Sequence, residues 1–150
     1  MTDDSWRDIR PIAVGVATRG DELLLSELHD PEADETFYRP PGGAMAFGES
    51  SDEALEREFA EELGVTIAER SLVETLERTF TFRGQMGHEI WFLYAVAFEE
   101  SWPYEREAFT GVEDDGESFR VVWRERSALA DETVYPEELP DLLARGSGVP

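Results

Sequence analysis

The stretch Gly43–Val65, with the sequence GAMAFGESSDEALEREFAEELGV, limits the local fold of this chain more than any other. Ser50 is followed three residues later by Glu53. This is the spacing of a capping box, in which each side chain bonds the other residue's backbone N–H at a helix start. Gly64 comes directly after the last residue of an apolar stripe and is typical of a helix end. The pattern therefore predicts a helix over residues 51–63.

Three carboxylates lie on one side of this predicted helix, at Glu58, Glu61 and Glu62. At about 100° of rotation per residue they fall within an arc of roughly 100°. Like charges so placed repel one another, so we expect a cation among them. Mg²⁺ prefers oxygen ligands and often bridges carboxylates to substrate phosphates. The turn predicted at Pro40–Gly43 can bring a backbone carbonyl to the same ion. On spacing alone, a solvated acidic helix face remains the alternative.

The same stretch carries a longer pattern. From Gly43, five residues lead to Glu49, seven more lead to Arg57, and the sequence EFAEELGV follows. This pattern resembles the signature of the Nudix hydrolases at every specified position. The resemblance implies a metal-dependent hydrolase of compounds in which a diphosphate is linked to another group. It also implies an α/β fold, an α/β/α sandwich with a mixed β-sheet between helices.

Individual roles follow from the resemblance only where residues match. Gly42 would shape the loop, and Glu49 would pair with Arg57 to fix that loop against the helix and orient the acids. The implied ligands of Mg²⁺, or of Mn²⁺ in its place, are the Gly43 carbonyl, Glu58, Glu61 and Glu62.

The expected reaction is attack of a metal-activated water on a phosphoanhydride, with a carboxylate taking the water's proton. Within the signature, Glu58 or Glu61 is a candidate for that base. Glu117 is our first choice outside it, because it precedes a predicted strand that ends at Trp123. A solvated turn glutamate is the alternative for Glu117. Glu113 and Glu89 are further candidates outside the signature.

The expected substrate is a small diphosphate compound that contains a nucleotide. Arg39 stands just before the glycine turn, where it would contact a substrate phosphate together with Gly42 and Gly43, or else pair with a surface acid. A Nudix-fold module that binds such a ligand without hydrolysing it is the alternative function. Aromatic residues that would stack on a base, or else pack in the core, are Tyr38, Phe47, Phe82, Trp91 and Trp102.

The 150 residues are enough for one domain, residues 1–150, with its own core. The segments 72–82 and 88–98 are strongly β-prone and should pair as an antiparallel hairpin. The segments 29–35 and 99–115 are acidic and read as loops, the second of them lid-like. Further strands are expected at 11–17, 22–26, 37–39 and 118–123, and a closing helix over 136–144 that ends at Gly146.

Composition excludes several classes of function. With 35 acidic and 13 basic residues the net charge is −22, which argues against a general nucleic-acid surface. There is no cysteine, so disulfides and thiolate metal sites are excluded. The polar N-terminus does not resemble a signal peptide, and the apolar run Ile90–Phe98 is too short to span a membrane. We therefore expect a cytoplasmic protein, for which a homodimer is compatible with the sequence.

Every basic residue is arginine, and lysine is absent. An acidic surface is typical of proteins that work in concentrated salt, where repulsion is screened to about 3 Å at 1 M. Genomic base composition that favours arginine is the alternative explanation. On the salt hypothesis, we expect the melting temperature to rise between low salt and multimolar KCl. A melting temperature that stays constant or falls over this range would exclude the hypothesis.

Overall fold

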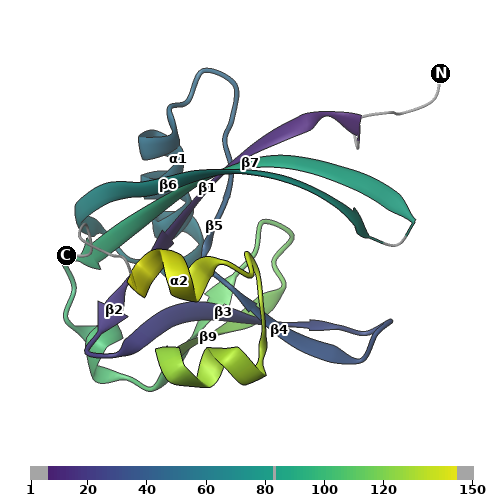
Figure 1. Ribbon diagram of the computed structural model, residues 1–150. Coiled ribbons are helices and arrows are strands. Elements are labelled where there is room, and N and C mark those ends of the chain that lie inside the picture. Colours follow the sequence, from purple (N-terminus) through teal and green to yellow (C-terminus); the bar gives the residue numbers. More distant parts are fainter. Residues whose placement is uncertain (1–6, 83, 145–150) are drawn as a thin grey trace.

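The computed structural model describes residues 7–82 and 84–144 (Figure 1). Their first sheet has the strand order β5-β1-β7-β6. β1 and β7 are parallel, whereas the two outer strands are antiparallel to their neighbours. The strands of this sheet are β1 (Ile9–Val16), β5 (Gly42–Ala44), β6 (Ile67–Phe82) and β7 (Gln85–Phe98).

The second sheet has the order β10-β4-β3-β9-β8, and β2 also pairs with β3. β10 and β4 are parallel, and the other pairs are antiparallel. Both sheets are therefore mixed. The strands are β2 (Thr18–Arg19), β3 (Glu22–Asp30), β4 (Glu35–Arg39), β8 (Ala108–Val112), β9 (Ser118–Glu125) and β10 (Thr133–Val134).

The helical segments lie on the two sides of these sheets. Helix α1 (Ser51–Glu58) continues into a π-helical turn, η2 (Phe59–Leu63), and α2 (Leu139–Ala144) lies near the C-terminal end of the described chain (Figure 1). None of the described helices is both long enough and apolar enough to cross a membrane. Two short 3₁₀ helices complete the set, η3 (Trp102–Glu105) and η4 (Arg126–Asp131).

Alternation along the strands divides the interior into two cores, because successive strand residues point to opposite faces. Ala13 and Leu24 face a core that contains Leu55, Phe59 and Leu63 of α1 and η2. Their neighbours on β1 and β3 face a second core, which α2 completes. Strand layers therefore lie between α1 and α2, and the expected α/β/α sandwich class is confirmed. The neighbours in the second core are Ile12, Val14, Leu23 and Leu25, and α2 contributes Leu139 and Leu142.

The local signals around α1 are confirmed in detail. The Ser50 side chain accepts from the Glu53 N–H, and the Glu53 carboxylate accepts from the Ser50 N–H. Gly64 ends the helical segment with a left-handed φ of 71°. The last turn differs from the regular helix predicted over 51–63. The N–H groups of Gly64 and Val65 both reach the Phe59 carbonyl, which widens this turn.

The long hairpin of β6 and β7 is also confirmed, with a register that runs from Ile67 opposite Phe98 to Phe82 opposite Gln85. The loop expected at 29–35 is wrong in part. β3 continues to Asp30 and β4 begins at Glu35, because a turn with φ of 50° at Asp34 closes a tight hairpin.

The lid-like loop expected over 99–115 is wrong for most of its length. η3 and β8 occupy it, and Trp102, Tyr104 and Phe109 pack against the core that contains α1. The acidic residues between these aromatics conceal the strand pattern. The predicted turn at Pro40–Gly43 is likewise a strand from Gly42 onward. α2 is shorter than the predicted closing helix, and the end expected at Gly146 lies outside the described residues.

Candidate functional site

A cleft of about 470 Å³ opens beside α1, and we call it the acidic cleft. It lies between β5 on one side and the loop that joins β8 to β9 on the other. Most of the residues singled out by the sequence line it, so the fold brings them together. These are Arg39, Gly42, Gly43, Arg57, Glu58 and Glu62. Glu89 and Asp114 also line it.

Arg57 is the centre of a hydrogen-bond network at the base of this cleft. Its Nε and Nη2 donate to the two carboxylate oxygens of Glu49, at 2.6 and 3.0 Å. Nη2 also donates to the Ala44 carbonyl at 3.2 Å, and Nη1 donates to Glu58 at 2.8 Å and Glu61 at 3.3 Å. Arg57 therefore joins the loop before α1 to the acids on the helix.

This network holds its members in their charged forms. Hydrogen bonds from Arg57, and from the Ala46 N–H, lower the pKa of Glu49 to about 2. Hydrogen bonding to Glu49, followed by Glu58, raises the pKa of Arg57. The predicted pair of Glu49 and Arg57 is thus present in the structure.

Glu58 is a buried carboxylate that is only partly satisfied. Its residue exposure is 4%, and its Oε2 is buried without a hydrogen-bond partner among the described protein atoms. A Cβ on Gly43 would come within 2.6 Å of the Glu58 carboxyl carbon, so a larger residue would displace this carboxylate. Gly42 is equally constrained, because its φ is 144° and a Cβ would lie 2.1 Å from the Ala13 carbonyl oxygen. Both glycines bring β5 close to β1 and Glu58.

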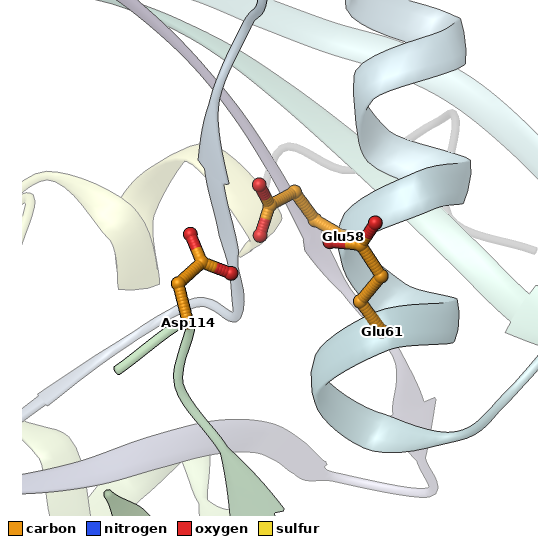
Figure 2. A group of neighbouring side chains, drawn as sticks. All are labelled: Glu58, Glu61 and Asp114. Carbon is orange, nitrogen blue, oxygen red and sulfur yellow. The ribbon is translucent and has the colours of Figure 1, made fainter. Parts of the chain in front are cut away.

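Three carboxylates converge at one end of the cleft. Glu58, Glu61 and Asp114 each offer an oxygen, and these oxygens lie within 4.8 Å of one another. Figure 2 shows Glu58 and Glu61 side by side on the helix, with Asp114 facing them from the opposite loop. Anionic oxygens at such distances suit a hard divalent cation.

Glu62 lines the same cleft beside Glu58 and completes the acidic set. Burial, followed by hydrogen bonding to Glu58 and the nearby charges of Glu58, Asp114 and Glu113, raises the pKa of Glu62 to about 8. Without a cation, the Glu62 carboxyl group therefore carries a proton at neutral pH and has no charge. Because a metal ligand must be deprotonated, binding of a divalent ion here should release that proton.

The raised pKa of Glu62 has a consequence for stability. The folded protein holds a proton that the unfolded chain loses near the ordinary value of 4.5. Its contribution to the free energy of unfolding is complete below pH 4.5 and is lost as the pH rises through about 8. We expect the melting temperature of the metal-free protein to fall over this window. Glu62→Gln should flatten that slope, as measured by thermal denaturation in EDTA, and an equal slope in the variant would contradict the assignment.

The remaining candidates for a general base lie in three different places. Glu113 lines a small side cavity with Arg39, Gly42 and Glu62. Glu89 lines the acidic cleft, where it accepts from Trp91 Nε1 at 2.8 Å. Glu117 is exposed in the turn between β8 and β9, and its N–H donates to Asp115. The structure does not bring Glu117 into the group that Asp114 joins.

Sequence reasoning missed Asp114. The spacing of the helical acids repeats with the helix, whereas Asp114 reaches them only because β8 and β9 end opposite α1. The run Glu113-Asp114-Asp115 indicated an acidic turn but did not indicate which carboxylate faces the helix.

A second cavity of about 350 Å³ adjoins the acidic cleft and shares Arg39 and Glu89 with it. We call it the aromatic cavity, because Phe37, Phe80, Trp91 and Tyr135 line it. Of the stacking candidates predicted from the sequence, only Trp91 is among its described lining residues. Tyr38 is in the core, Trp102 packs against the core, Phe47 is fully exposed, and the Phe82 side chain lies outside the described part of the structure.

Arg39 stands where the two cavities meet. Burial lowers its pKa, against the raising effect of Glu89, Glu62 and Glu113. Its guanidinium carbon lies 5.5 Å from the centre of the Trp91 ring. The structure thus places Arg39 on the path between the converging carboxylates and the aromatic cavity.

Comparison with known proteins gives one family and one fold. The family model of the NUDIX domain matches residues 9–144. A NUDIX hydrolase from Nitrosomonas europaea has a TM-score of 0.66 at 20% identity, over 95% of this chain and 93% of that chain. The MutT NUDIX hydrolase from Burkholderia pseudomallei has a TM-score of 0.63 at 20% identity, over 89% and 95%. The E. coli ORF135 protein has a TM-score of 0.59 at 20% identity, over 95% and 96%. No match was found among curated proteins.

The solved structures share the fold with this chain at an identity too low to transfer function. The family model, in contrast, spans both sheets and α2 as well as the stretch from which the resemblance was drawn. That resemblance is therefore confirmed, and the chain belongs to the Nudix family.

Proposed function

We propose that this protein is a metal-dependent hydrolase that cleaves the phosphoanhydride of a nucleoside diphosphate linked to another group. The observation that carries the proposal is the acidic cleft itself. Buried Glu58 meets Glu61 and Asp114 there, beside Arg39 and next to a cavity with aromatic walls. A diphosphate needs cationic partners, and its organic substituent needs an apolar surface, so this arrangement suits both parts of such a substrate.

The residues present fit a divalent metal ion. The unpartnered Oε2 of Glu58 is buried, and the neighbouring oxygens of Glu61 and Asp114 leave room for a cation but repel one another without it. The donors are all oxygens, as Mg²⁺ or Mn²⁺ requires. Glu58, Glu61, Glu62 and Asp114 would hold the metal, together with the Gly43 carbonyl. When bound, such an ion neutralises diphosphate charge and lowers the pKa of a coordinated water.

The chain's own residues supply positioning and proton transfer. The bidentate contact of Arg57 with Glu49 fixes the loop, and its contact with Glu58 fixes the helix side of the cleft. Arg39 is placed to donate to a phosphate oxygen. A carboxylate takes the proton of the attacking water, and the geometry favours Asp114 over Glu117 for this role because Asp114 faces the helical acids. The bridging oxygen then leaves with one phosphate, which gives two phosphate monoesters.

A binding module without hydrolysis is the competing function for this fold. Loss of the arginine or of a helical acid would mark such a module, and Glu58, Glu61, Glu62 and Arg57 are all present. The deciding experiment incubates the protein with Mg²⁺ and a panel of ADP-ribose, dinucleoside polyphosphates, nucleotide sugars and oxidised nucleoside triphosphates. Chromatography should detect nucleoside monophosphate from at least one compound, and EDTA should abolish its formation. Binding without any product would instead support the module.

A further inference from the structure

The aromatic cavity contains two arginines whose side chains make no hydrogen bond or ion pair with any other described residue. Arg78 lies with its guanidinium carbon 5.2 Å from the Trp91 ring centre and 5.9 Å from that of Tyr135. Arg39 faces the same tryptophan at 5.5 Å. The Nε of Arg78 is also buried without a partner among the described protein atoms. A buried donor in a native structure calls for a partner, and a ligand is one way to supply it.

The acids of this cavity, in contrast, already have partners. Glu89 accepts from Trp91 Nε1 and pairs with Arg10 at 3.5 Å. Glu35 accepts from the Thr133 hydroxyl. Asp30 accepts from the Glu32 N–H at 3.0 Å. In a chain with 35 acidic and only 13 basic residues, carboxylates compete for every guanidinium. Arg106 and Arg126 also have no ion pair among the described residues, but they lie apart from each other, whereas Arg39 and Arg78 line the same cavity.

Two other arginines with a buried, unpartnered Nε differ from Arg78. Arg124 forms an ion pair with Glu132, so its charge is compensated. Arg126 lines a cavity with no second arginine, although that cavity has three acids, as the aromatic cavity does. These acids are Glu132, Glu137 and Asp141. The cavity of Arg126 shares no residue with the acidic cleft, whereas the aromatic cavity shares Arg39 and Glu89 with it.

The position of the aromatic cavity indicates which part of a substrate would occupy it. The hairpins β3–β4 and β6–β7 extend in the same direction, to the right in Figure 1, and both contribute lining residues. A diphosphate bound in the acidic cleft would meet this cavity at Arg39. The cavity would therefore receive the group attached to the diphosphate, with Phe37 and Phe80 against its apolar surface.

We propose that the aromatic cavity binds a second anionic group of the substrate, a phosphate monoester on its organic part that is not cleaved. Arg78 is its main ligand, and Arg39 lies between it and the hydrolysed diphosphate. The planar fork of N–H donors on a guanidinium matches phosphate oxygens, and arginine keeps its charge at any working pH. Arg78 is thus a specificity-determining residue, an inference that rests on the proposed hydrolase function.

The test uses diphosphate compounds in matched pairs that differ by one phosphate monoester. Suitable pairs are NADPH with NADH, and coenzyme A with its 3′-dephospho form. In at least one pair the phosphorylated member should have a kcat/KM at least about tenfold higher, as expected for a hydrogen bond to a charged group. Arg78→Gln should bring this ratio close to one, and Arg78→Lys, which keeps the charge but not the fork, should give an intermediate ratio.

Arg106→Gln is the matched control. Arg106 also lies over a tryptophan, 4.7 Å from the ring centre of Trp102, but it lines neither the acidic cleft nor the aromatic cavity. The ratio of this variant should equal that of the wild type. Equal kcat/KM within every pair, or an equal loss for both members in Arg78→Gln, would overturn the proposal. Diadenosine tetraphosphate and diadenosine diphosphate form a further pair, which differs in the length of the phosphate chain. A preference for the tetraphosphate without a preference in the other pairs would also overturn the proposal, because the second anionic group would then belong to the phosphate chain.

A binding measurement separates this proposal from the proposed function. Calorimetry in EDTA compares adenosine 2′,5′-bisphosphate and adenosine 3′,5′-bisphosphate with AMP. If none of the diphosphate compounds in the panel or the matched pairs is hydrolysed, the proposed hydrolase function fails. Tighter binding of one bisphosphate, lost in Arg78→Gln, still supports the anion site. If NADH is hydrolysed but neither bisphosphate binds more tightly than AMP, the second-anion proposal fails and the hydrolase stands.

Discussion

Glu58→Gln is expected to reduce Mg²⁺-dependent kcat/KM by about 10³-fold, because a catalytic metal supplies several kcal/mol and each 1.4 kcal/mol is about tenfold in rate. The melting temperature of the metal-free protein should not fall. The glutamine oxygen can still accept from Arg57 Nη1, which now contacts Glu58 at 2.8 Å. The amide also replaces the buried, unpartnered Oε2 and removes one of the charges that raise the pKa of Glu62. Glu58→Gln should therefore reduce activity without reducing stability.

Glu56→Gln is the control for this experiment. Glu56 lies on the same helix, but its side chain is 57% exposed and pairs with Arg70 at 3.4 Å on another side of α1. Steady-state kinetics and thermal denaturation should show little change in this variant. Wild-type turnover in Glu58→Gln would show that Glu58 is not a ligand of the catalytic metal. A loss of activity accompanied by a large fall in melting temperature would indicate that Glu58 supports the fold instead.

The local part of this site could be predicted from the sequence because its determinants are close together along the chain. The capping box at Ser50 and Glu53 and the glycine at position 64 act within a single helix, so their spacing alone locates α1. The pair of Glu49 and Arg57 is also local, because the loop and the helix are consecutive. The β6–β7 hairpin follows from two adjacent β-prone segments.

The unpredicted part depends on contacts between distant segments. Asp114 reaches the helical acids only through the placement of β8 and β9 in the second sheet. The aromatic cavity combines Phe37, Phe80 and Tyr135, which come from three separate parts of the chain. The β8 strand was missed because Phe109 and Gly111 face the interior while acidic flanks dominate the composition. The π-helical turn depends on two N–H groups that share one carbonyl, which apolar periodicity does not encode.

Asp114→Asn tests the residue that the structure adds to the site. We expect Mg²⁺-dependent kcat/KM to fall by about 10²-fold or more, the lower range for loss of a general base. The fold should persist, because Asp114 is exposed in a turn. Glu117→Gln is the matched control, since Glu117 lies three residues away in the same turn, is also exposed, and is not in the group of converging oxygens. Its activity should stay near that of the wild type.

The dependence on Mg²⁺ concentration then separates the two roles open to Asp114. If it binds the metal, Asp114→Asn should require more Mg²⁺ for half-maximal activity, and excess Mg²⁺ should restore part of kcat. If it takes the proton of the attacking water, kcat should stay low at saturating Mg²⁺. A large loss in Glu117→Gln together with full activity in Asp114→Asn would reverse the assignment. The base would then be Glu117, which would have to reach the cleft through a change in the turn between β8 and β9.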